Sequence, residues 1–181
     1  MDRVKTLVNF PYQHVLILGL AKSGTAAAHL LLDHGVTVRV NDLNASFSDP
    51  EVQALKQKGA ECILGHHSLS VIDGIEVMIK NPGIPYEHPL VKAAINRQIP
   101  VLTEIELAGQ IAEGKIIGIT GSNGKTTTTT LITNMLQHSN QSVKMAGNIG
   151  IAASDVARQT KQDDVLVLEL SSFQLLGVQT F

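Results

Sequence analysis

The sequence contains Ile116-Ile117-Gly118-Ile119-Thr120-Gly121-Ser122-Asn123-Gly124-Lys125-Thr126, an apolar run that leads directly into a glycine-rich turn. The apolar run predicts a buried strand, and the amphipathic segment after the turn predicts a helix. A strand, a glycine-rich loop and a helix that begins at Lys-Thr together form a P-loop, which binds nucleotide phosphates. The usual first glycine of that motif is Ile119 here, and a glycine stands at Gly121 instead. We therefore predict a variant P-loop.

The residue types in this loop suit phosphate chemistry despite the variation. Gly121 and Gly124 let the backbone wrap around phosphate groups, and Lys125 offers a point charge to the β- and γ-phosphates. The hydroxyl of Thr126 can ligate Mg²⁺. Five consecutive threonines begin at Thr126, and in the first turn of a helix their hydroxyls can serve backbone groups, a metal or a phosphate. A chance match to this strand, turn and helix remains the alternative.

A second strand carries one carboxylate in an otherwise apolar run, Val165-Leu166-Val167-Leu168-Glu169-Leu170. An ionised carboxylate at the end of a buried strand needs a cationic partner. Glu169 therefore suits a Mg²⁺ ligand beside the P-loop, directly or through water. The alternative is a strand-end glutamate that faces solvent.

Short apolar runs alternate with segments of helical period along the whole chain, which is typical of an α/β fold built on parallel sheets. We predict a Rossmann-like parallel-sheet domain over residues 1–113 and the first part of a P-loop ATPase domain over residues 114–181, because Gly114 interrupts the pattern before the P-loop strand. The second domain is incomplete by this interpretation, since three strands leave a sheet edge unpaired. The predicted strands are 15–20, 36–41, 61–64, 75–79, 101–102, 116–120, 142–146 and 165–170, and the predicted helices are 23–34, 49–58, 88–97, 104–112 and 151–159, with one more after the P-loop.

Length and charge exclude several classes of function. The chain has 181 residues, with 14 Lys and Arg against 16 Asp and Glu, which gives a net charge of −2. This balance, with no basic block, argues against a nucleic-acid surface and a polybasic membrane patch. The longest apolar stretch near the N-terminus, residues 15–20, is too short to cross a bilayer, and no signal peptide is evident. We expect a cytoplasmic protein with no membrane partner.

A first glycine loop, Gly19-Leu20-Ala21-Lys22-Ser23-Gly24, follows the first predicted strand and opens a helix. It is similar to the dinucleotide fingerprint G-x-G-x-x-G, except that Ala21 replaces the middle glycine. Asp42 ends the next strand, where such folds contact a ribose or an equivalent group. Asn81-Pro82-Gly83-Ile84-Pro85 follows the fourth strand and should lie at the same edge of the sheet. A tight turn without a ligand and an NAD-dependent dehydrogenase remain alternatives for this half.

Three stretches together resemble the Mur ligase family: Thr120–Thr127, Gly147-Asn148-Ile149-Gly150, and Leu168-Glu169-Leu170-Ser171-Ser172-Phe173-Gln174-Leu175. The Ser-Ser-Phe-Gln run resembles the corresponding segment in the branch of the family that adds D-glutamate. The first glycine loop, Asp42 and Asn81-Pro82-Gly83-Ile84 match the same branch in order, so the resemblance covers essentially the whole chain.

The resemblance implies a role for each matched residue. Lys125 and Glu169 would be catalytic, and Thr126 and Glu169 would hold Mg²⁺. The uridine diphosphate end of the precursor would contact Lys22, Ser23, Asp42 and Gly83, and the muramoyl-alanine arm would pass Asn148, Ser171 and Gln174. ATP would be bound by Gly121, Ser122, Asn123, Gly124, Lys125, Thr126 and Thr127.

The resemblance also implies a reaction. ATP would convert the carboxylate of UDP-N-acetylmuramoyl-L-alanine into an acyl phosphate, which the amine of D-glutamate would then attack. The family has three domains, so the sites for D-glutamate would lie beyond this chain, and the chain alone is expected to be inactive. A non-catalytic module that binds the UDP precursor is the alternative for the isolated chain. The full-length enzyme is expected to be a monomer.

Overall fold

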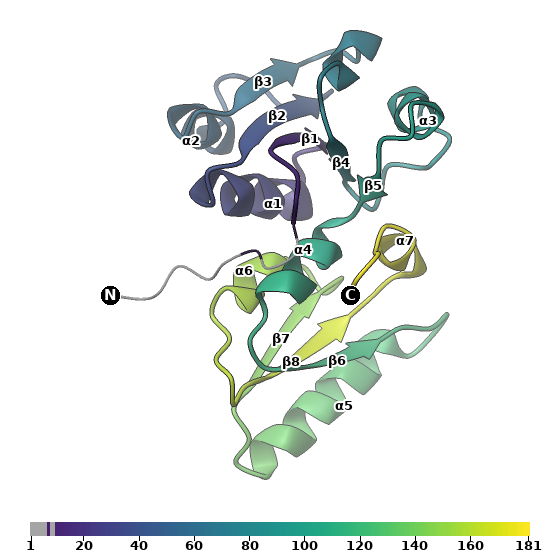
Figure 1. The fold of residues 1–181 in the computed structure, drawn as a ribbon. Helices are drawn as coiled ribbons and strands as arrows, with labels where there is room; N and C mark the ends of the chain where they lie inside the picture. Colours follow the sequence, from purple (N-terminus) through teal and green to yellow (C-terminus); the bar gives the residue numbers. More distant parts are fainter. Residues whose placement is uncertain (1–6, 8–9) are drawn as a thin grey trace. The chain divides into compact units, whose positions relative to one another are not determined.

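The computed structural model describes residue 7 and residues 10–181. Their contacts divide into two compact units, Phe10–Glu104 and Ile105–Phe181 (Figure 1). Each unit has a parallel sheet of its own, which confirms the predicted α/β class. The two units are described separately below.

The first unit is a five-stranded parallel sheet in the order β3-β2-β1-β4-β5. This order places β1 and β4 side by side at its centre, so the loops that follow these two strands lie at the same edge. Its strands are β1 (His14–Leu18), β2 (Thr37–Asp42), β3 (Glu61–Leu64), β4 (Val77–Lys80) and β5 (Val101–Leu102). Its helices are α1 (Lys22–Asp33), α2 (Pro50–Gln57), η1 (Leu69–Ile72) and α3 (Pro89–Asn96).

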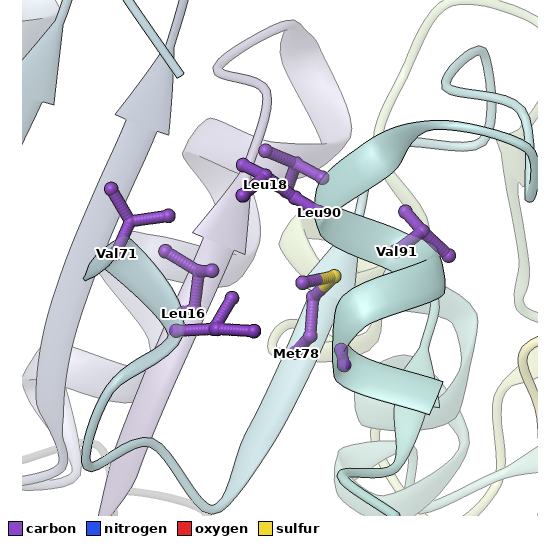
Figure 2. Packing of buried hydrophobic residues seen from close by; sticks show 8 residues of the cluster. Leu16, Leu18, Val71, Met78, Leu90 and Val91 are labelled. Atoms are coloured by element: carbon purple, nitrogen blue, oxygen red, sulfur yellow. The ribbon is translucent and has the colours of Figure 1, made fainter. Parts of the chain in front are cut away.

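Local sequence fixes where these helices begin. Both α2 and α3 have proline in the first turn, where the missing N–H costs nothing. The ring of His88 accepts a hydrogen bond from the Leu90 N–H and so caps α3. Helix α3 then packs its apolar face on the sheet, where Leu90 and Val91 meet Leu16, Leu18 and Met78 (Figure 2). This buried cluster anchors the segment between β4 and α3.

The second unit has a three-stranded parallel sheet in the order β6-β8-β7. Its strands are β6 (Lys115–Ile119), β7 (Val143–Gly147) and β8 (Val165–Glu169), and its helices are α4 (Glu104–Ile111), α5 (Lys125–His138), α6 (Ala153–Ala157) and α7 (Ser172–Leu175). Helix α5 packs against all three strands. Every residue of β8 is buried, and β8 is the central strand, with β6 on one side and β7 on the other. The end of β8 therefore lies between the ends of β6 and β7.

The division of the chain falls earlier than the boundary at residues 113 and 114 that the sequence predicts. Helix α4 groups with the second unit rather than closing the first. Its buried Glu106 accepts hydrogen bonds from the backbone N–H groups of Gln179 and Thr180, at 2.7 and 3.1 Å. This anchor between α4 and the end of the chain has no signature in the local sequence.

Gly24 offers a test of the close packing between α1 and the first glycine loop. A Cβ at this position would lie 1.9 Å from the carbonyl oxygen of Gly19, which is backbone and cannot move aside cheaply. We expect Gly24→Ala to lower the free energy of unfolding by about 2–3 kcal/mol. Urea unfolding followed by circular dichroism measures this change.

Gly35→Ala is the matched control, because a Cβ there meets nothing and only the positive φ of 75° is unfavourable. It should cost about 1 kcal/mol. Equal losses in the two variants would contradict the proposed steric contact.

Candidate functional site

The glycine-rich loop of residues 120–124 joins the end of β6 to the start of α5. Lys125 is the first residue of α5, and its ammonium donates hydrogen bonds to the carbonyl oxygens of Gly121 and Ser122 at 2.8 and 3.4 Å. The loop residues Ser122, Asn123 and Gly124 are exposed, as is Thr127 in the first turn. The helix N-terminus thus presents unpaired backbone N–H groups and a lysine at an accessible surface, which favours an anion.

The carboxylate of Glu169 lies beside this loop and is 2% exposed. The Thr126 hydroxyl donates to its Oε2 at 2.6 Å, and the side-chain amide of Asn148 donates to its Oε1 at 3.2 Å. Each of the three residues comes from a different element: Thr126 from α5, Asn148 from the segment after β7, and Glu169 from the end of β8. Glu169 does not face solvent, so that alternative is wrong.

A close backbone approach sets the position of Asn148. Its N–H donates to the carbonyl oxygen of Glu169 at 2.8 Å. A Cβ on Gly147 would lie 2.2 Å from that same oxygen, so only glycine lets the two segments come this near. In the structure Asn148 holds Glu169, and its predicted contact with the precursor stays a prediction.

The donor set suits Mg²⁺. A threonine hydroxyl and a carboxylate are hard oxygen ligands, and Mg²⁺ is usually held by one or two such groups plus phosphates and water. Within residue 7 and residues 10–181, no three His, Cys, Asp or Glu side chains gather as a larger metal cluster. Thr126 and Glu169 are two groups of the second unit that could hold the ion of a bound nucleotide.

Ser171 and Gln174 follow β8 and bind each other. Gln174 Oε1 accepts from the Ser171 N–H at 2.8 Å, and Ser171 Oγ accepts from the Gln174 N–H at 3.3 Å. This reciprocal pair is the capping box of α7. The spacing Ser-x-x-Gln is its known sequence signal, so helix α7 could have been predicted.

The first unit gathers its candidate residues at the carboxyl edge of its sheet. Asp42 ends β2, and its carboxylate accepts hydrogen bonds from the N–H groups of Leu20, Asn44 and Ala45 at 2.6, 2.7 and 2.8 Å. Burial raises the pKa of Asp42, but the three N–H donors and the nearby His67 more than offset it, so the pKa lies below its usual value. Asp42 thereby ties the first glycine loop to the loop after β2.

Asn81 links two residues that the sequence predicts as precursor contacts. Its amide donates to Ser23 Oγ at 3.1 Å, and its Oδ1 accepts from the Gly83 N–H at 3.0 Å. Lys22 is exposed at the first position of α1. Asn81 itself was missed as a site residue, although its position between a strand and a Pro-Gly turn signals a loop at the ligand edge.

Family models match both units of the chain. The N-terminal domain of Mur ligases of the MurD-like group matches residues 13–103, and the Mur ligase middle domain matches residues 119–179. The chain belongs to the Mur ligase family.

Individual relatives of this Mur ligase chain carry one name, UDP-N-acetylmuramoylalanine–D-glutamate ligase. The protein of Oceanobacillus iheyensis is 55% identical over 97% of this chain and 39% of its own length. Those of Halalkalibacterium halodurans and Streptococcus mutans are each 51% identical over 98% of this chain and 40% of their own lengths. The chain thus spans about two fifths of the length of these relatives.

Solved structures agree on the fold. A UDP-N-acetylmuramate:L-alanyl-gamma-D-glutamyl-meso-diaminopimelate ligase from Neisseria meningitides aligns with a TM-score of 0.52 at 16% identity, over 86% of this chain and 52% of that chain. A murein peptide ligase from Psychrobacter arcticus aligns with a TM-score of 0.53 at 18% identity, over 89% of this chain and 39% of that chain. Among the described residues, no helix has the length and apolar character that a membrane crossing requires.

The hydrogen bonds to Asp42 predict a pH dependence of stability. Because the folded pKa lies below the unfolded value of 3.8, the stabilisation is complete above that value and is lost as the pH falls through the folded pKa. We expect the free energy of unfolding to drop more steeply below about pH 4 in the wild-type Mur ligase chain than in Asp42→Asn. Urea titrations between pH 3 and pH 7 measure this difference.

Glu87→Gln, which alters an exposed carboxylate of the same unit, is the control and should keep the wild-type profile. If the free energy of unfolding of Asp42→Asn fell below pH 4 as steeply as that of the wild type, the three N–H donors would not stabilise the ionised form of Asp42.

Proposed function

We propose that the full-length protein joins D-glutamate to UDP-N-acetylmuramoyl-L-alanine at the expense of ATP, a step of peptidoglycan precursor synthesis. The observation that carries this proposal is the buried Glu169 carboxylate, held by Thr126 and Asn148 beside the P-loop. The name of the relatives supplies the two substrates. ATP and Mg²⁺ are the expected cosubstrate and metal ion.

The chemistry explains why a phosphate site is needed. A carboxylate is a poor electrophile, so its oxygen first attacks the γ-phosphorus of ATP and ADP leaves. The amine of D-glutamate then attacks the carbonyl carbon of the acyl phosphate, and inorganic phosphate leaves as the amide forms. The first step brings two anions together, so positioned positive charge and N–H donors must offset their repulsion.

The residues of the second unit suit this task. Lys125 would turn from the Gly121 and Ser122 carbonyl oxygens to the β- and γ-phosphates, while loop N–H groups bind the remaining phosphate oxygens. Thr126 and Glu169 would hold Mg²⁺, which supplies positive charge to the phosphates when bound. Asn148 keeps the Glu169 carboxylate oriented. Ser171 and Gln174, at the same edge, would line the path of the muramoyl-alanine arm.

The first unit would hold the uridine diphosphate end. The N-terminus of α1 offers backbone N–H groups to the diphosphate, and Lys22 and Ser23 lie in its first turn. Asp42 and Gly83 would border the same pocket. The full-length protein would work in the cytoplasm as a monomer. The 181-residue chain by itself would not catalyse the ligation.

The role of Lys125 is testable in the full-length enzyme. We expect Lys125→Ala to reduce acyl-phosphate formation by about 100–1,000-fold, because a charge that acts on the transferring phosphoryl group is lost. Its affinity for UDP-N-acetylmuramoyl-L-alanine should stay within about twofold of wild type, since the first unit would hold the uridine diphosphate end of this ligand. Borohydride trapping of the acyl phosphate and calorimetry measure the two quantities.

Lys161→Ala, which removes an exposed lysine of the same unit, is the control and should behave as wild type. Comparable turnover in Lys125→Ala would refute the proposed role.

The 181-residue chain tests substrate binding directly. We expect calorimetry to show saturable binding of UDP-N-acetylmuramoyl-L-alanine and none of NADH. Binding of NADH alone would favour a dehydrogenase, and incorporation of D-glutamate by this chain would contradict the expected inactivity. Precursor binding without any effect of ATP in the full-length protein would favour a non-catalytic module.

A further inference from the structure

The last residue of β4 is a fully buried lysine. Lys80 is 1% exposed and lies beside Leu18 of β1. It follows Met78 by two residues, so it extends from the same face of the sheet as the apolar cluster in Figure 2. No carboxylate among the described residues lies within ion-pair distance of its amine. Such a group is costly to bury, and an apolar side chain of similar volume would pack here at lower cost.

The amine of Lys80 instead contacts one short loop. It donates hydrogen bonds to the carbonyl oxygens of Ile84 at 2.9 Å and Asn81 at 3.5 Å. It also lies 4.7 Å from the centre of the Tyr86 ring. Burial lowers the pKa of Lys80, in keeping with a group that is retained against its desolvation cost. Both acceptors belong to residues 81–84, which Lys80 thus draws onto the end of β4.

That same loop carries the link to the first glycine loop. Asn81 binds Ser23 through its amide and Gly83 through its Oδ1. The Asn81 N–H also donates to the Leu18 carbonyl oxygen at 2.8 Å. A continuous series of contacts therefore runs from Lys80 through Asn81 to Ser23 and Gly83, two of the residues proposed to bind the uridine diphosphate end.

We infer that Lys80 is a positioning residue that fixes residues 81–84 against the first glycine loop and so sets the geometry of the diphosphate site. This inference rests on the proposed function for its ligand. It differs from a purely structural role in one respect. A lysine kept only for stability should destabilise the fold when it is replaced, whereas a lysine kept for positioning can be replaced by an apolar residue without that loss.

Lys80→Met separates these roles, because methionine fills most of the volume and removes the amine. We expect the midpoint of thermal unfolding to stay the same or rise, and the affinity for UDP measured by calorimetry to fall by about tenfold. The control is Lys92→Met, which removes an exposed lysine of α3 and should change neither quantity. Wild-type UDP affinity in Lys80→Met, or a lower unfolding midpoint with unchanged affinity, would overturn the inference.

A double-mutant cycle tests whether Lys80 acts through Asn81. Lys80→Met and Asn81→Ala should each weaken UDP binding, and the double variant should be little weaker than the more affected single variant. Additive losses would mean that Lys80 does not work through this loop.

Amide chemical shifts in the ligand-free chain give a readout that does not depend on UDP binding. In Lys80→Met the backbone amides of Gly83, Ile84 and Ser23 should shift or exchange faster, whereas the amides of β1 should not. If the wild-type chain binds no UDP, the diphosphate site proposed for this unit is wrong, and Lys80 has no role in binding that ligand. The amide shifts would still show whether Lys80 fixes residues 81–84. Should Lys80→Met fail to fold, Lys80→Gln takes its place and must weaken UDP binding for the inference to stand.

Discussion

The parallel pairing of strands determines where every candidate residue lies. In the second unit β8 pairs with β6 on one side and β7 on the other, so the loops that leave these three strands meet at one edge. Thr126, Asn148 and Glu169 come from three separate segments and can converge only for this reason. The same constraint in the first unit brings together the loops after β1, β2 and β4. An antiparallel arrangement would send alternate loops to opposite edges and would disperse both sites.

The buried charged groups at these edges are each held by hydrogen bonds or ring contacts to neutral partners. Glu169 obtains a hydroxyl and an amide, Asp42 obtains three backbone N–H groups, and Lys80 obtains two carbonyl oxygens and an aromatic ring. The hydrogen-bond partners named here are all neutral, and only Asp42 has a charged neighbour named above, His67, which also lowers its pKa. Neutral partners hold the charged groups in place while leaving the local charge uncompensated. A site built in this way can still attract a charged ligand or a metal ion.

Much of this arrangement could be predicted from the sequence because the signals are local. The apolar run of β8 with its single glutamate, the glycine-rich turn and the Lys-Thr pair each fall within a few residues. The ends of the predicted strands differ from the observed ones by at most two residues. The strand predicted over residues 75–79 ends one residue before Lys80, whereas the observed strand β4 includes it. A lysine usually indicates that a buried strand has ended. Periodicity cannot show that a lysine is buried when its partners are carbonyl oxygens of the following loop.

Long-range contacts account for the remaining differences. The amide of Asn148 binds Glu169, which lies 21 positions away along the chain, and the sequence gives no sign of this contact. Helix α4 follows the first unit in sequence and nevertheless groups with the second, because Glu106 binds backbone groups more than 70 residues further on. Both contacts pair a buried carboxylate with distant N–H donors. A sequence pattern can identify a carboxylate that must be satisfied, but only the folded chain determines which donors reach it. The functional assignment of a matched residue therefore depends on its partner as well as on its place in the motif.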